Sequence, residues 1–297
     1  MTATTQEDHR ERMLRVLQYL EEHPDETYSL DALAALAAYS PYHFHRIFTG
    51  MVGESVKSYV RRIRLERAAW RLRYQRARVT DIALDAGYET PESFTRAFRA
   101  VFGQSPTRYR QLARNDRATE AGGESVPLRD RLHPKQGESD MEAKIVQLPA
   151  FTAACVRHVG PYRECGKAWE RLCSWAGPIG LLTPDTRFFG VSLDDPDVTP
   201  ADKLRYDACI SVAEGTPGGE GIEIRRLAGG EYAMTVHKGP YEQLSGTYAT
   251  LCGVWLPGQG REIAAAPSLE HYLNDPGRTA PEALLTEVYV PLLPLPR

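Results

Sequence analysis

Two stretches of the chain, SPYHFHRIFTGMVGESVKSYV at residues 40–60 and TPESFTRAFRAVFGQSPTRYR at residues 90–110, share the pattern F-x-R-x-F-x₄-G-x-S-x₃-Y. A repeat with a period near fifty residues indicates a repeated supersecondary unit. Each copy follows an alanine-rich apolar stretch and a turn, which is the layout of a helix-turn-helix. The sequence therefore predicts two DNA-reading helices in one polypeptide. The matching positions are Phe44, Arg46, Phe48, Gly53, Ser55 and Tyr59 in the first copy, and Phe94, Arg96, Phe98, Gly103, Ser105 and Tyr109 in the second.

Helix start and stop signals surround both copies. Proline follows Ser40 and Thr90, where a first-turn proline sacrifices no helical hydrogen bond. Gly53 and Gly103 follow the two reading helices and predict their ends. Between the copies, apolar residues at helical spacing predict one long connecting helix over residues 55–75.

The residues expected to read DNA lie on the outward face near the start of each reading helix. With Phe44, Ile47 and Phe48 in the core, the polar neighbours of the first helix face outward. Arg46 and Arg96 hold the same place in both copies, so a phosphate contact or salt bridge is an alternative role for them. Residues that differ between the copies are better candidates for reading bases. The candidate DNA-binding residues are Tyr42, His43, His45 and Arg46 in the first helix, and Glu92, Ser93, Thr95 and Arg96 in the second.

Positive charge is concentrated in the same half of the chain. Residues 1–115 carry 18 Lys or Arg and 14 Asp or Glu, whereas residues 116–297 carry 18 and 25. Nine basic residues and a single acidic one lie between Lys57 and Arg78. A charge run of this kind is usually a solvated helix face. Its position between two reading helices favours phosphate contacts for some of these residues, with Arg61 and Arg62 as candidates.

Residues 10–112 resemble the DNA-binding domain of the AraC/XylS family of transcription regulators. The resemblance is carried by SPYHFHRIF, RLERAAWRLR and IALDAGYETPESFTRAFRAVFGQSPTRYR. It implies two helix-turn-helix units joined by a long helix, with reading helices in successive major grooves about one turn apart. Pro91 and Glu92 occupy positions where polar donors are frequent in that family. A carboxylate at position 92 accepts from cytosine N4 but repels phosphate.

The second half of the chain has the sequence pattern of β-strands rather than that of a helical domain. Residues 114–140 are rich in charge, Gly and Ser and predict a linker between domains at 1–113 and 141–297. RHVGPY at 157–162 matches VHKGPY at 236–241 at an offset of 79, so we expect two pseudo-symmetric repeats with a ligand cleft at their seam. Strands are predicted at 144–147, 153–159, 188–191, 207–212, 222–227, 232–237, 270–273 and 287–292. The fold class is therefore an all-α double helix-turn-helix followed by an α+β domain.

Two E-x-Y triplets are the most distinctive polar feature of this half. Residues i and i+2 of a strand share a face, so Glu270 lies beside Tyr272, and Glu287 beside Tyr289. A carboxylate among aromatic rings suits a cationic or amphipathic aromatic ligand. The alternative is that most of these aromatics are core residues and one glutamate is solvated. Further aromatic candidates for effector binding are Tyr162, Trp169, Tyr206 and Tyr241.

Residues 142–297 resemble the GyrI-like effector-binding domain through HVGPY and HKGPY, YDACISV, PSLEHYLNDP and TEVYVPL. The resemblance implies a cleft between two repeats that binds small, often cationic or lipophilic molecules, as in multidrug binding. It also implies a central glutamate, which corresponds to Glu270, with Glu287 as the second candidate. His271 replaces a more usual apolar residue and is expected to point away from the pocket.

Three functions remain open from the sequence. The first is a one-component transcription regulator that binds double-stranded DNA and a small-molecule effector, with RNA polymerase as a further partner. The second, which the resemblance to GyrI-like proteins implies, is a hydrolase of an electrophilic small molecule, in which Glu and Tyr activate water. Turnover of a cyclopropanoid electrophile by the wild type but not by Glu270→Gln would favour it. The third is a module that binds another protein. Fusion to a DNA-binding domain favours the regulator, and we therefore expect no catalytic residues.

The composition bears on the cellular compartment of the protein and on the cofactors that it is expected to bind. No apolar run approaches the ~20 residues that span a bilayer, and the N-terminus MTATTQEDHRER has no apolar core of a secretory signal. Five cysteines without a C-x-x-C pair argue against a disulfide framework or a zinc site. We expect a cytoplasmic protein with reduced thiols, no metal, no cofactor and no membrane partner.

Overall fold

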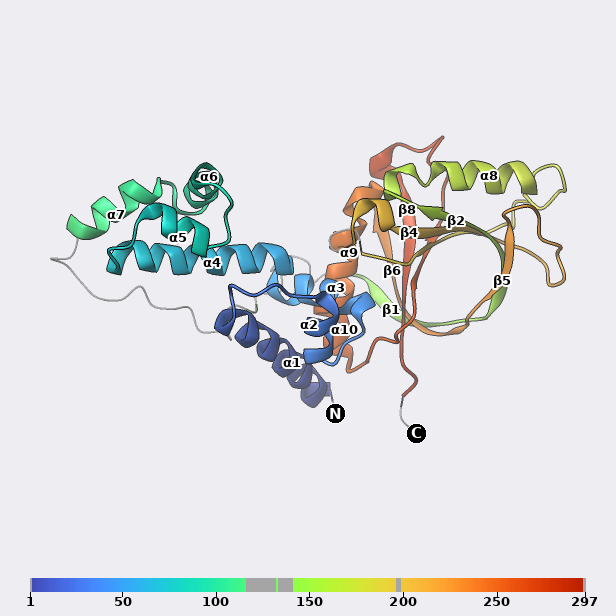
Figure 1. The fold of residues 1–297 in the computed structure, drawn as a ribbon. Coiled ribbons are helices and arrows are strands. Elements are labelled where there is room, and N and C mark those ends of the chain that lie inside the picture. The colour runs from blue at the N-terminus through green and yellow to red at the C-terminus, as the bar shows by residue number, and fades with distance from the viewer. Residues whose placement is uncertain (1, 116–131, 133–140, 196–198, 296–297) are drawn as a thin grey trace.

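The structure, a computed structural model, describes residues 2–115, 132, 141–195 and 199–295. A helical N-terminal part is followed by a part built around a curved β-sheet (Figure 1). The predicted connecting helix at 55–75 is α4, and the two reading helices are α3 and α6. The N-terminal helices are α1 (Thr2–Glu22), α2 (Leu30–Leu36), α3 (Pro41–Val52), α4 (Val56–Tyr74), α5 (Val79–Asp85), α6 (Pro91–Phe102) and α7 (Pro106–Asn115).

Local side-chain chemistry sets the limits of these helices. The Ser29 hydroxyl accepts the Ala32 N–H at 3.1 Å and starts α2, and Thr90 accepts the Ser93 N–H at 3.2 Å and starts α6. Gly53 and Gly103 end α3 and α6 with φ of 83° and 73°. Only glycine adopts this left-handed conformation without steric cost. The α2–α3 and α5–α6 pairs are thus the two helix-turn-helix units.

The C-terminal part contains every strand that the sequence predicts, each within two residues of its expected ends. The predicted α+β fold made of two repeats is therefore confirmed. The strands are β1 (Ala143–Leu148), β2 (Phe151–Val159), β3 (Phe188–Ser192), β4 (Arg205–Ser211), β5 (Glu223–Leu227), β6 (Gly230–Lys238), β7 (Ser268–Tyr272) and β8 (Leu285–Pro291). The helices are α8 (Gly166–Ala176), α9 (Leu244–Thr250), the π-helical η6 (Leu251–Trp255) and α10 (Leu256–Gln259), with 3₁₀ turns η3 (Tyr162–Glu164), η4 (Ala201–Lys203), η5 (Tyr241–Gln243) and η7 (Pro281–Ala283).

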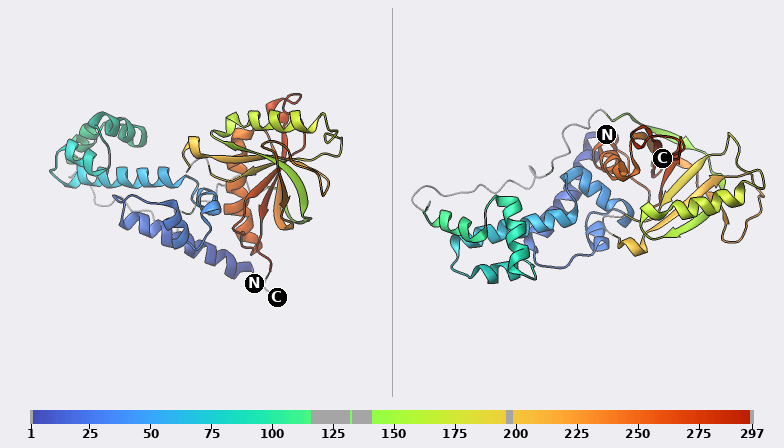
Figure 2. Two further views of the ribbon diagram at one scale, coloured as in Figure 1. Left: turned by 45° about the vertical axis from the view of Figure 1, so that its right-hand side comes forward. Right: turned by 90° about the horizontal axis from the view of Figure 1, so that it is seen from above.

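The strands form one antiparallel sheet in the order β1-β6-β8-β7-β3-β4-β2-β5. The two repeats meet at the β3–β7 pair, where Gly190 lies opposite Glu270. These two residues hold equivalent places in their strands, so the pseudo-twofold axis passes between them. The sheet curls, and α8 and α9 lie outside the curl (Figures 1 and 2).

Alternation along the strands sends side chains to two separate cores. Outside the curl, Leu172 of α8 packs with Ala154 and Ile210. Inside it, Phe189 packs with Leu269 and Tyr289. Which of these two faces a strand residue occupies decides whether it belongs to the candidate site.

The first helix-turn-helix unit shares one hydrophobic core with the C-terminal part. Phe44 and Phe48 of α3 belong to the same buried cluster as Leu251 of η6 and Val288 of β8. The second unit has a core of its own, formed by residues of α4, α5 and α6. Figure 2 accordingly shows α5, α6 and α7 projecting away from the sheet.

The predicted domain limits at 113 and 141 stay a prediction. Helix α7 continues to Asn115. Most of the predicted linker lies outside the described residues, although Leu132 is buried in the shared core. In space, the change from one core to the other occurs along α4, between Ile63 and Leu65.

No helix in the described ranges combines the length and the apolar character needed to cross a lipid bilayer.

Candidate functional site

Glu270 lies buried at the centre of the sheet and accepts three side-chain hydrogen bonds. Ser192 of β3 and Tyr248 of α9 donate to its Oε1 at 2.9 Å and 3.1 Å. Tyr272 of β7 donates to Oε2 at 2.7 Å. The Glu270 side chain is 5% exposed. Three hydroxyl donors stabilise the carboxylate in this buried position, because hydrogen bonds to an ionised group are the stronger kind.

Aromatic side chains surround this carboxylate. The hydroxyls of Tyr206 and Tyr272 are 2.9 Å apart, and the Trp169 ring lies 5.8 Å from that of Tyr272. Tyr241 also packs against Tyr272, with 5.3 Å between ring centroids. We call Glu270 and these rings the aromatic–carboxylate cluster, whose aromatic members are Tyr162, Trp169, Tyr206, Tyr241, Tyr248 and Tyr272.

Burial shifts the pKa values of the tyrosines in the cluster. It raises the pKa of Tyr206, Tyr248 and Tyr272 well above the ordinary tyrosine value, and the nearby Glu270 charge raises each pKa further. Burial also raises the pKa of Tyr241 to about 12. The tyrosines therefore remain hydroxyl donors at neutral pH, and the cluster presents one acidic group within aromatic walls.

Gly190 makes room for two of the tyrosines. A Cβ added at Gly190 would lie 2.5 Å from the Tyr206 hydroxyl and also collide with that of Tyr272. A side chain at this position would therefore push apart the two rings that sit over Glu270. The absence of a side chain at Gly190 is therefore required by the cluster, because the two tyrosine hydroxyls occupy the space that a Cβ would need.

We expect Gly190→Ala to lower stability by about 1–3 kcal/mol, the usual cost of overpacking a core, and to weaken ligand binding at the cluster. Urea unfolding and ligand titration of the full chain measure the two effects. Gly166→Ala is the matched control, because a Cβ there meets no atom within 4 Å. Equal behaviour of the two variants would contradict the role given to Gly190.

Glu287 and Tyr289, also predicted as effector-binding, lie apart from this cluster. In the β7–β8 register, Glu270 pairs with Val288, and His271 pairs with Glu287. Glu287 accepts hydrogen bonds from His271 at 2.8 Å and from Tyr289 at 2.6 Å, and Tyr289 packs in the core inside the curl. Neighbouring strand positions face opposite sides, so the two carboxylates do not share a site.

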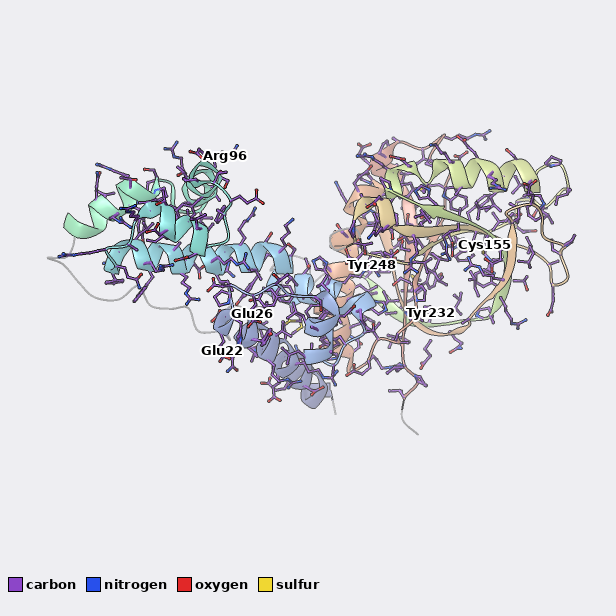
Figure 3. All side chains as sticks on the ribbon, in the orientation of Figure 1. Glu22, Glu26, Arg96, Cys155, Tyr232 and Tyr248 are labelled. Atoms are coloured by element: carbon purple, nitrogen blue, oxygen red, sulfur yellow. The ribbon has the colours of Figure 1, made fainter. Side chains whose placement is uncertain are left out.

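The reading helix of the second unit is open to solvent. Glu92 and Arg96 are exposed on α6, while Ser93 and Thr95 are half-buried. The Ser93 hydroxyl donates to the Thr90 carbonyl at 2.8 Å, which occupies it in the helix start. Figure 3 shows Arg96 at the end of the molecule that lies away from the sheet.

The reading helix of the first unit is docked on the C-terminal part. His43, His45 and Arg46 are 1%, 5% and 9% exposed. His43 Nε2 lies 3.1 Å from the Ala266 carbonyl, and His45 Nδ1 lies 3.1 Å from Asp195. Burial, with the neighbouring Arg46 charge, lowers the pKa of His43 to about 3.

The expectation that these residues face outward is therefore not met in this arrangement, because loop residues Ala266 and Asp195, with strand β7 and helix α9, cover them. Tyr42 lies in α3, with a side chain outside the described set.

Arg46 reaches from α3 to the aromatic–carboxylate cluster. Its Nη1 donates to the Ser268 hydroxyl at 2.9 Å, and its guanidinium lies 3.7 Å from the centroid of the Tyr248 ring. Tyr248 in turn bonds Glu270, and Figure 3 shows it where the two parts of the chain meet.

The basic residues of α4 divide into paired and exposed groups. Arg62 donates to Glu54 and Glu66, both at 2.8 Å, whereas Arg61 and Lys57 are exposed. A surface cavity of about 620 Å³ is lined by Arg64, Arg67, Trp70 and Arg71 among others, on the N-terminal part rather than at Glu270.

The described part of the chain holds no group of three His, Cys, Asp or Glu side chains placed to bind a metal ion. The cysteines are free thiols. Cys155 and Cys209 face each other across β2 and β4 with 2.8 Å between their sulfurs, inside the curl and on the face opposite to Glu270.

Three residues at the aromatic–carboxylate cluster were not among the predicted effector-binding residues. Tyr248 aligns with Trp169 at the repeat offset of 79, so the internal repeat was a usable signal for it. Ser192 and Arg46 carried no such signal, since they reach Glu270 and Tyr248 only through the sheet register and the docking of α3.

Two protein-family models match this chain, one in each part. Residues 141–293 match the GyrI-like small molecule binding domain, and residues 33–112 match a helix-turn-helix domain. The probable transcriptional regulator YgiV of Escherichia coli K12 is 31% identical over 154 residues, covering 51% of this chain and 96% of YgiV.

The regulatory protein SoxS of Salmonella typhimurium is 31% identical over 102 residues, 34% of this chain and 95% of SoxS. The right origin-binding protein of Escherichia coli K12 is 40% identical over 96 residues, 32% of this chain and 33% of that protein. Among solved structures, the EcmrR C-terminal domain aligns with a TM-score of 0.43 at 17% identity, over 52% of this chain and 98% of that one.

Proposed function

Because the chain belongs to the AraC-type transcription regulators that carry a GyrI-like small-molecule binding domain, we propose that its effector is a small cation with an aromatic or lipophilic body, bound at the aromatic–carboxylate cluster. One observation carries this proposal: Glu270 is a buried carboxylate with aromatic rings on several sides. Such a site attracts a cation through its charge and through the faces of the rings.

The exposure of the cluster supports entry of a ligand from the surface. Tyr162, Trp169, Tyr241 and Tyr272 are half-buried, whereas Tyr206 and Tyr248 are 3% exposed. The outer rings thus offer contact area, and the inner ones hold the carboxylate in place. A positive charge over Tyr272 or Tyr241 comes within reach of Glu270, because Tyr272 bonds it directly.

Thermal shift of the full chain tests the ligand class, since a ligand that binds the native state raises its melting temperature by mass action. The probes are benzamidinium with neutral benzamide, and N-dodecylpyridinium with neutral dodecylbenzene. We expect a rise with each cation and a much smaller one with its neutral partner. Equal shifts for both members of each pair, or none, would refute the proposed effector class.

The DNA-binding role is proposed to rest on the exposed face of α6 and on α3 once it is accessible. In this proposal Arg96, Glu92 and Thr95 of α6 meet base edges, and the exposed Arg61 contacts phosphate. As a transcription regulator, the protein is further proposed to act on RNA polymerase at its promoters.

Arg96→Ala is expected to weaken binding of a duplex selected from a random pool by the wild-type chain. A base or phosphate contact of this kind contributes about 1–3 kcal/mol, so the loss is about 5- to 150-fold. Arg278→Ala removes the same charge from an exposed turn of the C-terminal part and serves as control. Electrophoretic mobility shift at fixed salt measures both, and equal losses would contradict a direct contact from Arg96.

A further inference from the structure

The strongest unexplained feature of the molecule is the burial of α3, the helix expected to enter a major groove. It packs on α9 and η6 with backbone close to backbone at one point. A Cβ added at Gly50 would lie 2.7 Å from the Cα of Gly253, and one added at Gly253 would lie 2.6 Å from the Cα of Gly50. The interface therefore depends on two glycines that lie about 200 residues apart in the chain.

Three polar side chains of α3 have partners in the C-terminal part. His43 meets a backbone carbonyl, His45 meets the Asp195 carboxylate, and Arg46 meets a hydroxyl and an aromatic face. Each of these groups would have to leave its partner before it could reach a base edge. A major groove about 12 Å wide must surround the face of the helix that it admits, and here that face is covered.

Arg46 connects this docking to the ligand site. Its guanidinium lies on the face of Tyr248, whose hydroxyl donates to Glu270. Its second partner, Ser268, lies two residues before Glu270 on the same strand and the same face. A planar cation of the protein's own thus lies at the edge of the aromatic–carboxylate cluster.

We propose that the Arg46 guanidinium is an internal ligand of this cluster and that a planar aromatic cation competes with it, so that effector binding releases α3 for DNA. The inference rests on the proposed function and adds the direction of the effect: the effector raises the affinity for DNA. Both DNA and effector bind the released arrangement, so each strengthens the binding of the other by the same factor. The fitting effector class is an aryl amidinium or guanidinium, whose shape and charge match the Arg46 head group.

The first test loosens the docked arrangement without touching DNA-reading or cluster residues. Gly253→Ala inserts a methyl group between α3 and η6, whereas Gly246→Ala adds one on α9 where no atom lies within 4 Å. On a duplex selected from a random pool by the wild-type chain, Gly253→Ala is expected to bind at least about tenfold more tightly, and Gly246→Ala as the wild type does. Amides of α3 should exchange hydrogen faster in Gly253→Ala only.

Asp195→Ala provides a second variant in case Gly253→Ala fails to fold. It removes the partner of His45 from a loop outside the cluster, and exposed Asp185→Ala is its control. Tighter DNA binding by Asp195→Ala alone supports the inference. Faster exchange in α3 without a gain in DNA affinity, in whichever variant folds, overturns it.

Benzamidinium is the probe for the coupling. It should raise the DNA affinity of the wild type and have little effect on Gly253→Ala, in which α3 is already released. If benzamidinium binds the wild type but leaves its DNA affinity unchanged, the inference fails while the proposed function stands. If no cation binds, the proposed function and the competition both fail, and the variants alone decide whether α3 is withheld from DNA.

Discussion

Glu270→Gln is expected to weaken binding of a cationic effector at least about thirtyfold, whereas Glu287→Gln leaves it unchanged. Loss of one member of a buried, hydrogen-bonded charge pair costs about 2 kcal/mol or more, which corresponds to that factor. Glutamine keeps the shape of the side chain but removes the charge that the ligand would meet. The two glutamates belong to neighbouring strands and face opposite sides of the sheet, so Glu287→Gln is a matched control.

Isothermal titration of the full chain with benzamidinium at constant ionic strength measures this loss. The melting temperature of each variant without ligand shows whether the fold is intact. Equal affinities of wild type and Glu270→Gln, or equal losses in both variants, would remove Glu270 from the centre of the site.

The second large effect concerns the buried Asp207, which holds three strands together. Asp207 of β4 is fully buried and accepts from Arg157 of β2 and Arg225 of β5. The double variant Arg157→Met with Arg225→Met would leave this carboxylate buried without a counter-charge. We expect a loss of about 3–5 kcal/mol in the free energy of unfolding, since a buried charge without its partner is strongly destabilising.

Asp207→Ala should cost less than the double variant, about 1–3 kcal/mol, because the arginines left behind are partly exposed and can be hydrated. Arg226 lies next to Arg225 on β5 and forms an exposed ion pair with Glu214. Arg226→Met removes that pair and should change stability by less than about 1 kcal/mol, which makes it the control. Urea unfolding of the four proteins gives this order. A double variant as stable as Arg226→Met would contradict the structural role given to Asp207. The ligand affinity of the double variant would show whether Tyr206, next to Asp207, had moved.

Local signals in the sequence were sufficient for the helices and strands and for most members of the aromatic–carboxylate cluster. Ser29, Thr90, Gly53 and Gly103 act within one helical turn, so their effect does not depend on the rest of the fold. The 79-residue repeat likewise predicted the two halves of the sheet. Six of the eight predicted effector residues gather at Glu270: Glu270, Tyr162, Trp169, Tyr206, Tyr241 and Tyr272.

The sequence by itself determined the two helix-turn-helix units, the strands and the residue types of the aromatic–carboxylate cluster, because turns, caps and apolar periodicity are short-range. Only the tertiary structure separated Glu270 from Glu287, since the register of β7 against β3 and β8 places one carboxylate under the aromatic rings and the other inside the curl. It alone also placed α3 against η6. That contact depends on the close approach of Gly50 and Gly253, and no local pattern encodes a fit between surfaces so distant in the chain.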